Sequence, residues 1–265
     1  MKREASVKGA FYPESCVDVE YLMEQFDDIL NKALANSDVL AIKPRAIISP
    51  HAGYVYSGLT ASIAHRVLAN SNPKRVIVIG PSHRVYLNGI SGSFYDRYET
   101  PCGDLEIDRE YLEALKEKFD IEFIPEAHHE HSTEVQMPFI KHYINDPKVV
   151  ELVYGDINPI NLSKICEYIL NDKQNVIVIS TDLSHYHSQK EANQLDSICL
   201  KGVEDLDIAL LKSCEACGII GVEAIVMAAK KMGLVSRILD YRTSADASGD
   251  ESSVVGYMSV AFLNQ

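Results

Sequence analysis

Short apolar runs alternate along this chain with longer segments in which apolar residues recur at helical spacing. Short apolar runs bounded by turn residues predict buried strands. We expect strands at residues 45–49, 76–79, 89–94, 121–124, 149–154, 176–179, 235–241 and 253–262. The clearest helix covers residues 17–34, with apolar positions at Leu22, Phe26, Ile29, Leu30 and Leu34. Further helices are expected at residues 60–68, 108–119, 161–170, 189–212 and 218–232.

This order of elements is typical of an α/β fold. Strands joined by crossover helices form a mostly parallel sheet that is covered by helices on both faces. We therefore expect a three-layer α/β sandwich. The longest candidate linker, residues 35–43, is too short and too mixed in composition to separate folding units. We expect a single domain over residues 1–265.

Three predicted strands are each followed closely by a histidine. These are His51, His83 and His185, the first two on turns marked by proline and glycine. Ligands of open α/β sheets bind beyond the carboxyl ends of the strands. If the three strands are neighbours in one parallel sheet, the three imidazoles converge. One histidine after a strand is more often an ordinary hydrogen-bonding residue, but three in one chain favour a site.

Composition and charge exclude several classes of function. The formal net charge is −13 and no basic stripe is present, which argues against nucleic acid as a partner. No apolar run approaches the ~20 residues needed to span a bilayer, so we expect no membrane association. The N-terminal residues lack the apolar core of a signal peptide. We therefore expect a cytoplasmic protein.

The six cysteines are scattered, at positions 16, 102, 166, 199, 214 and 217. Such spacing in a long cytosolic chain does not suggest a disulfide framework. Cys214 and Cys217 have the C-x-x-C spacing of redox and zinc sites. However, a structural zinc ion needs four ligands and the chain has no second pair. We expect both to be small buried thiols at the start of a helix.

A second group of histidines lies in residues 128–134, His-His-Glu-His-Ser-Thr-Glu. Only His128 and His131 have a spacing at which side chains meet on one face of a helix. We expect a loop that enters the edge of the site, with Glu130 and His131 nearest to it. A surface histidine cluster is the alternative.

Two histidines and one carboxylate that leave three coordination positions open form the facial triad of non-haem Fe(II) oxygenases. His51 and His83 would supply the imidazoles. Spacing alone does not choose the carboxylate, and four candidates stay open, namely Asp182, Glu130, Asp246 and Asp250.

Seven motifs run in order over nearly the whole chain. They are Gly9-x-Phe11-Tyr12-Pro13, Pro50-His51-Ala52-Gly53-Tyr54-x-Tyr56-Ser57-Gly58, Gly80-Pro81-Ser82-His83, Thr100-Pro101-x-Gly103, Glu130-His131-Ser132-x-Glu134, Ser180-x-Asp182-x-Ser184-His185 and Cys217-Gly218. Together they resemble the Memo family, whose prokaryotic members are called AmmeMemoRadiSam system protein B. That family in turn resembles the class III extradiol dioxygenases of LigB-like fold, which cleave catechol rings with Fe(II) and O2.

The resemblance implies a metal centre. The two iron-binding histidines match His51 and His83. The third ligand lies in the loop before the last strand, where metazoan Memo proteins have a cysteine. Aligning Ser252-Ser253-Val254 with the equivalent serine pair places Asp246 there. A carboxylate favours Fe(II) as the cofactor, with Zn, Mn or Cu as alternatives.

The resemblance also implies roles around the metal. The acid/base histidine of the dioxygenases matches His185. A histidine suits that role because its pKa lies near neutral pH, and Asp182 could orient it. Four residues are expected to line the substrate pocket, namely Tyr54, Tyr56, Glu130 and His131. The system name implies AMMECR-type and radical SAM proteins as partners.

Three functions follow as hypotheses. The first is an iron-dependent oxidoreductase related to the extradiol dioxygenases, acting on an unknown small molecule. The second is a non-catalytic binding or signalling protein whose pocket takes a peptide or a phosphorylated ligand. This chain shows no arginine cluster of the kind that phosphotyrosine recognition normally uses. The third is a metal-dependent hydrolase with a metal-activated water.

Overall fold

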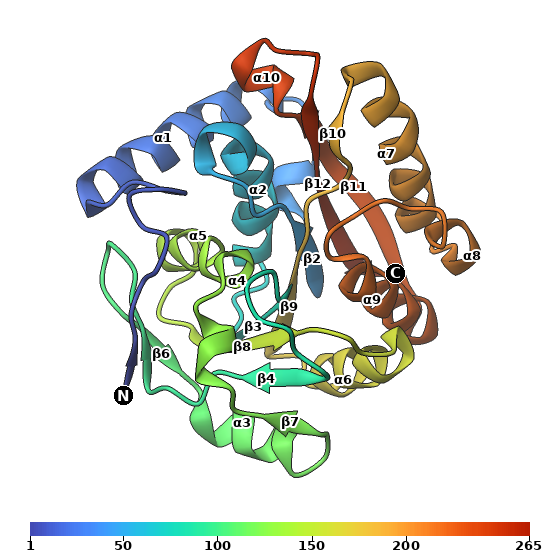
Figure 1. Cartoon of the computed structure of the whole chain (residues 1–265). Helices are drawn as coiled ribbons and strands as arrows, with labels where there is room; N and C mark the ends of the chain where they lie inside the picture. Colours follow the sequence, from blue (N-terminus) through green and yellow to red (C-terminus); the bar gives the residue numbers. More distant parts are fainter.

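A computed structural model describes residues 1–265 and contains a twelve-stranded sheet (Figure 1). The strands are β1 Lys2–Arg3, β2 Ala46–Ser49, β3 Arg75–Pro81, β4 Ile90–Gly92, β5 Arg97–Tyr98, β6 Leu105–Ile107, β7 Ile121–Glu122, β8 Lys148–Tyr154, β9 Asn175–Ser180, β10 His185–His187, β11 Leu234–Thr243 and β12 Val254–Asn264. The order is β1-β5-β6-β8-β3-β9-β2-β12-β10, with β11 on β12 and β4 between β7 and β8. Strands β6, β8, β3, β9 and β2 are parallel to their neighbours in this run, and β12 is antiparallel to β2.

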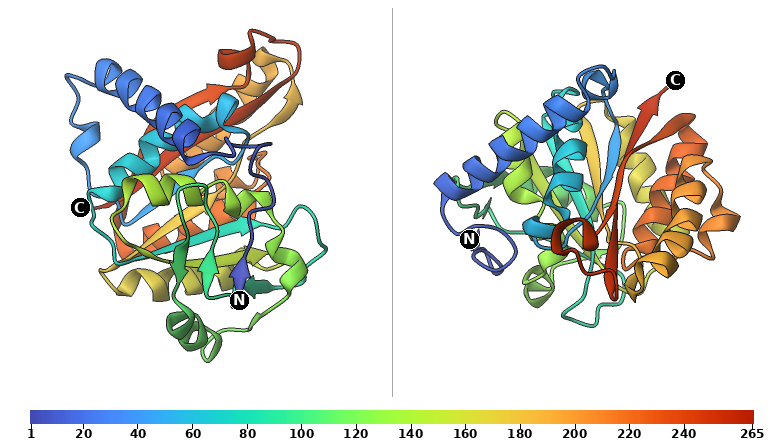
Figure 2. Two further views of the ribbon diagram at one scale, coloured as in Figure 1. Left: turned by 90° about the vertical axis from the view of Figure 1, so that its left-hand side faces the viewer. Right: turned by 90° about the horizontal axis from the view of Figure 1, so that it is seen from above.

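Helices cover both faces of this sheet, as Figure 2 shows from above. They are α1 Cys16–Ala33, α2 Tyr54–Ala69, α3 Arg109–Lys116, α4 His131–Glu134, α5 Met137–Tyr143, α6 Pro159–Asn171, α7 Gln189–Glu204, α8 Ile208–Leu211, α9 Ile219–Met232 and α10 Ala245–Ser248. Two short 3-10 helices lie at Val39–Ala41 and Pro125–His128. The predicted three-layer α/β architecture with a mostly parallel sheet is confirmed.

Alternation along the central strands explains the two cores. Successive side chains of a strand point to opposite faces. In β3, Ile77 and Ile79 pack with α3, α6, α7 and α9 in one cluster of buried residues. Val76 and Val78 pack with α2 and α5 in the other. Such strands are apolar on both faces because helices cover both sides of the sheet.

Two helix boundaries differ from the sequence prediction. Helix α2 begins at Tyr54, so the motif after His51 forms the first turns of this helix rather than a loop. The predicted helix over residues 189–212 is broken into α7 and α8. At the break Leu206 has a φ of 51°, a left-handed conformation that a continuous helix cannot contain.

The expectation of no disulfide framework was wrong. Cys16 is bonded to Cys102, and Cys199 is bonded to Cys214. The first pair is 86 residues apart in sequence, and only the fold brings the start of α1 to the turn at Thr100–Gly103. Disulfide pairing depends on such long-range geometry and cannot be deduced from cysteine spacing. Cys166 and Cys217 are free.

The N-terminal arm is fixed by one buried carboxylate. Glu134, at the end of α4, forms an ion pair with Arg3 and accepts hydrogen bonds from the backbone N–H groups of Ser6 and Val7. The hydroxyl of Tyr12 also donates to it, at 2.8 Å. These contacts fix α4 in place, and α4 carries one of the histidines described below.

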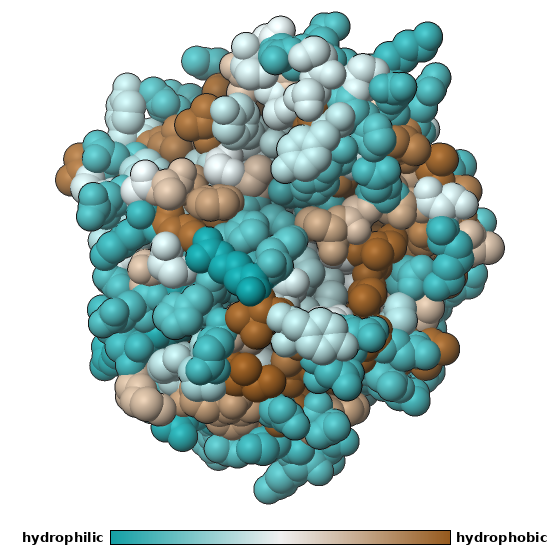
Figure 3. Space-filling view, in the orientation of Figure 1, coloured by the Kyte–Doolittle hydropathy of each residue, from teal (hydrophilic) through white to brown (hydrophobic).

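No helix is both long and apolar enough to cross a bilayer. Hydrophilic residues cover most of the face shown in Figure 3, and apolar residues form smaller patches between them.

Candidate metal centre

Two of the predicted histidines lie at the carboxyl ends of strands in the middle of the sheet. His51 follows β2 and His83 follows β3, and β9 lies between these two strands and pairs with both. The rings of His51 and His83 are 5.2 Å apart between centroids. The condition set by the sequence, neighbouring parallel strands, therefore holds.

The third imidazole of this cluster belongs to His131, the first residue of α4. Its ring lies 5.4 Å from that of His51 and 4.7 Å from that of His83. One potential ligand atom from each of the three residues lies within 4.8 Å of the others. Gly80 permits this close approach, because a Cβ atom there would lie 2.7 Å from Oγ of Ser132.

Each of the three rings has a partner at Nδ1. Nδ1 of His83 lies 3.1 Å from Oε1 of Glu130, and Nδ1 of His131 lies 2.8 Å from the same oxygen. Nδ1 of His51 lies 2.9 Å from Oγ of Ser180. Metal-binding histidines usually donate one ring N–H to such a partner and ligate through the other nitrogen. Nε2 of all three rings is thus the nitrogen available for a metal.

The hydrogen bonds around Ser180 fix the tautomer of His51. The Ser180 hydroxyl donates to the carbonyl oxygen of Ser132 at 2.6 Å. Oγ of Ser180 also accepts a hydrogen bond from the side-chain amide of Gln136. Because the single hydroxyl proton is used, Ser180 accepts from Nδ1–H of His51. Nε2 of His51 then carries a lone pair.

Burial and hydrogen bonding set the charges of the cluster. Burial lowers the pKa of His51 well below its usual value, and the neighbouring His83 and His131 lower it further. Burial by itself raises the pKa of Glu130, but hydrogen bonds from His131 and His83 and from backbone N–H groups hold it well below its usual range. The result is a neutral His51 beside an ionised Glu130, as a divalent metal requires.

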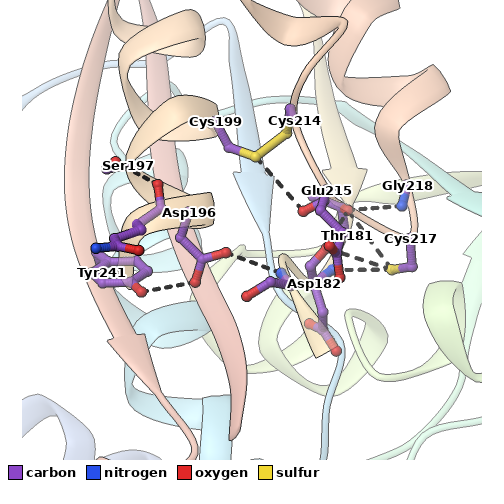
Figure 4. The surroundings of a disulfide bond; sticks show 12 residues. Thr181, Asp182, Asp196, Ser197, Cys199, Cys214, Glu215, Cys217, Gly218 and Tyr241 are labelled. Carbon is purple, nitrogen blue, oxygen red and sulfur yellow. Dashed lines mark hydrogen bonds between the residues drawn. A yellow bond between two sulfur atoms is a disulfide. The ribbon is translucent and has the colours of Figure 1, made fainter. Parts of the chain in front are cut away.

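Asp182 and Cys217 lie close to Nε2 of His51, and Figure 4 shows both residues. Oδ1 of Asp182 accepts from the backbone N–H of His51 at 2.7 Å, and Oδ2 lies 4.0 Å from Nε2. Sγ of Cys217 is 3.3 Å from the same Nε2. Burial raises the pKa of Asp182 to about 6, against the hydrogen bond from His51. Burial, together with Asp182, raises the pKa of Cys217 to about 12.

Gly218 brings Cys217 to this position. A Cβ atom on Gly218 would lie 2.7 Å from the carbonyl oxygen of Ser180, and its N–H donates to Oγ1 of Thr181 at 2.9 Å. Cys214 begins the same short segment and is fixed to α7 by its disulfide with Cys199. The sequence does not predict Cys217 in the site, although the pair Cys217-Gly218 is among the family motifs.

Comparison with known sequences identifies the family of this arrangement. The family model for Memo-like protein matches residues 3–261. The chain is 34% identical to a MEMO1 family protein of Methanobrevibacter smithii, covering 99% of this chain and 100% of the relative. It is 34% identical to a MEMO1 family protein of Aquifex aeolicus, covering 98% and 99%. The chain belongs to the Memo-like family.

The structure of this Memo-like protein does not bring Asp246 into the histidine cluster. Asp246 is exposed on α10, and its carboxylate accepts from the backbone N–H of Thr243 at 2.8 Å. The ligand atoms that converge are those of His51, His83 and His131. Ligation by Asp246 stays a prediction, and the structure offers His131 in its place.

His185 of this Memo-like protein lies at the start of β10, and its backbone N–H donates to Glu215 at 3.3 Å. Its strand β10 pairs with β12 at the end of the sheet, and its charge contributes to lowering the pKa values of both His51 and Asp182, so it lies near the cluster. The sequence predicts that His185 converges with His51 and His83, whereas the group of converging ligand atoms contains His131 and not His185. The acid/base role of His185 stays a prediction.

The two tyrosines of the motif differ in their surroundings. Tyr54 is 3% exposed, and its hydroxyl donates to the carbonyl oxygen of Val135. These contacts give it a packing role, and its predicted contact with substrate is not supported. Tyr56 is 46% exposed and lines a groove of about 360 Å³ beside α10, together with Ser244, Asp250 and Tyr257. Glu130, also predicted to contact substrate, instead positions His83 and His131.

Proposed function

We propose that this Memo-like protein binds a divalent transition metal, Fe(II) first among the candidates, through Nε2 of His51, His83 and His131. We further propose that it acts as an oxidoreductase on a small oxygen-bearing molecule. The observation that supports this best is the set of Nδ1 partners, Ser180 and Glu130, in three histidines whose potential ligand atoms lie within 4.8 Å of one another. Three hydrogen-bonded imidazoles whose ligand atoms did not converge would be ordinary polar packing.

The three imidazole nitrogens are suitable ligands for a divalent transition metal. Imidazole nitrogen suits iron, copper, zinc and nickel, and the three rings come from one side, which leaves coordination positions for other ligands. Glu130 is an outer carboxylate of the kind that raises the basicity of ligating histidines. His131 takes the third position that the sequence assigned to a carboxylate. The nearby Asp182 supplies negative charge in its place.

When bound, such a metal supplies Lewis acidity and one-electron chemistry with O2. The chain itself supplies the proton chemistry. Asp182 is buried 4.0 Å from Nε2 of His51, and burial raises its pKa to about 6, so it is mostly ionised at neutral pH. His185, at the open edge of β10, would accept a proton from an incoming hydroxyl group and return it later. Side chains at this edge would orient the substrate.

The test is metal analysis of the protein purified without oxygen, followed by O2 consumption with a panel of catechols. We expect about one iron per chain and oxygen uptake that depends on a catechol. A protein that binds no divalent metal under these conditions would refute the proposal. Tight metal binding without oxygen uptake would refute the oxidoreductase part and favour a metal-dependent hydrolase.

A further inference from the structure

A second group of metal-ligating side chains lies far from the histidine cluster in sequence and comes from different elements. Sγ of Cys16, Sγ of Cys102 and a carboxylate oxygen of Glu20 all lie within 4.8 Å of one another. Oε2 of Glu20 in turn lies 2.7 Å from Nδ1 of His142. Two sulfur atoms, one carboxylate and one imidazole are therefore gathered in one place.

Three elements build this group. Cys16 and Glu20 are one turn apart on α1, so their side chains share a face of the helix. Cys102 lies in the turn between Thr100 and Gly103. His142 lies in the last turn of α5. All four residues are partly exposed, so an ion could reach them from solvent.

In the structure the two sulfur atoms are joined as a disulfide. A disulfide sulfur is a poor metal ligand, whereas a thiolate is a strong one. Reduction would change the group from an acid–histidine pair beside a disulfide to two thiols beside a carboxylate and an imidazole. Four ligands of these types are what a tetrahedral zinc site uses.

We propose that Cys16, Cys102, Glu20 and His142 form a zinc site when the Cys16–Cys102 disulfide is reduced. In the reductive step a dithiol gives its two hydrogen atoms to the two sulfur atoms and itself becomes a disulfide. Zinc then displaces one proton from each thiol, and both protons go to solvent. Cys16 is the first residue of α1, where the positive end of the helix dipole stabilises a negative ligand.

The two states cross-link the same elements. In the oxidised state the disulfide joins α1 to the turn at Cys102, and in the reduced state the metal joins these two and α5 as well. The site therefore cannot bind zinc while the disulfide between Cys16 and Cys102 is intact. The site is independent of the proposed iron centre, since no residue is shared between them.

The test uses a His51→Ala/His83→Ala background, which removes the histidine cluster as a zinc site. The protein is reduced with a phosphine, which takes oxygen from water and competes less for zinc than a dithiol does. It is desalted without oxygen and titrated with zinc against a chromogenic chelator. Cobalt(II) is then used as a spectroscopic probe, because thiolate ligation gives a sulfur-to-cobalt charge-transfer band.

We expect the reduced protein to bind one more zinc than the oxidised protein and to show the charge-transfer band with cobalt. Cys16→Ser/Cys102→Ser should lose both. The matched control is Cys199→Ser/Cys214→Ser, which removes the other disulfide and should keep both. No added zinc after reduction, or a band that survives in Cys16→Ser/Cys102→Ser, would overturn the proposal.

Two single variants test the same site in case the double variant Cys16→Ser/Cys102→Ser does not fold. Glu20→Gln and His142→Ala keep the disulfide, so the fold can be checked in the oxidised state. After reduction each should weaken zinc binding at least about tenfold, because each removes a direct ligand. Affinities equal to that of the background protein would remove the two residues from the site and overturn the four-ligand assignment.

Discussion

The hydroxyl of Ser180 lies 2.9 Å from Nδ1 of His51 and, having donated its own proton to Ser132, can only accept there. This relationship fixes which nitrogen of His51 carries the proton and leaves the lone pair on Nε2. In the proposed metal centre Ser180 would therefore orient His51 without being a ligand itself.

Replacing Ser180 should weaken metal binding without unfolding the protein. Ser180→Ala removes the acceptor of Nδ1–H and frees the ring of His51 to rotate, so we expect about 10–100-fold weaker binding of Fe(II) or Zn(II). The control is Ser49→Ala. Ser49 is the register partner of Ser180, is also fully buried, and its hydroxyl has no hydrogen-bond partner. Equal affinities of the two variants in a metal titration would show that the hydrogen bond has no effect.

His65 should make the protein sensitive to acid. Burial lowers the pKa of His65 to about 4, against a hydrogen bond to Gln136, so the folded protein keeps it neutral below the pH at which the unfolded chain protonates it. Stability from this group is present above pH ~6.5 and is lost as the pH falls toward ~4, by roughly 3 kcal/mol in total. Chemical unfolding across this range should show a shallower loss for His65→Gln than for wild type. His129→Gln, at an exposed position, should match wild type, and a loss as steep in His65→Gln would contradict the assignment.

The disulfide between Cys199 and Cys214 should contribute measurably to stability. It closes a loop of 15 residues, for which the restriction of the unfolded chain amounts to about 3 kcal/mol. Under oxidising conditions Cys199→Ser/Cys214→Ser should lower the free energy of unfolding by about that amount in guanidinium titrations. A free energy unchanged from wild type would mean that the bond does not form in solution.

His185 should separate metal binding from turnover. If it transfers protons at the edge of β10, His185→Ala should keep the metal content of wild type and lose oxygen consumption. Its neighbour His187, which pairs with Glu215 at 3.1 Å, provides the control His187→Ala, with activity retained. Loss of metal from His185→Ala would instead place His185 among the ligands.

The location of the candidate site could be predicted from the sequence more accurately than the identity of its ligand residues. The apolar strands before His51 and His83 could be recognised, and parallel strands present their carboxyl ends at one edge of the sheet. His131 could be placed near that edge, but its ligand position depends on the contact between Gly80 and Ser132, which joins segments 52 residues apart in sequence. No local pattern encodes such a contact.

Asp246 is a residue whose place in the site the sequence could not settle. Its predicted ligand role depends on two serines in an exposed loop, where the neighbours of a residue do not restrict its orientation. In the structure its carboxylate accepts a hydrogen bond from the backbone N–H of Thr243. The position of Cys217 could not be predicted from the sequence, because its approach to His51 requires the turn at Gly218 to pack against Ser180. Its own segment gives no indication of that packing.

The identity of the third ligand can be measured directly by titrating Fe(II), without oxygen, into wild type, His131→Ala and Asp246→Ala, with circular dichroism as the check on folding. If His51, His83 and His131 form the metal centre, His131→Ala should bind Fe(II) at least about 100-fold more weakly, and Asp246→Ala should bind it as wild type does. Unchanged Fe(II) affinity in His131→Ala, together with its loss in Asp246→Ala, would contradict the proposed centre.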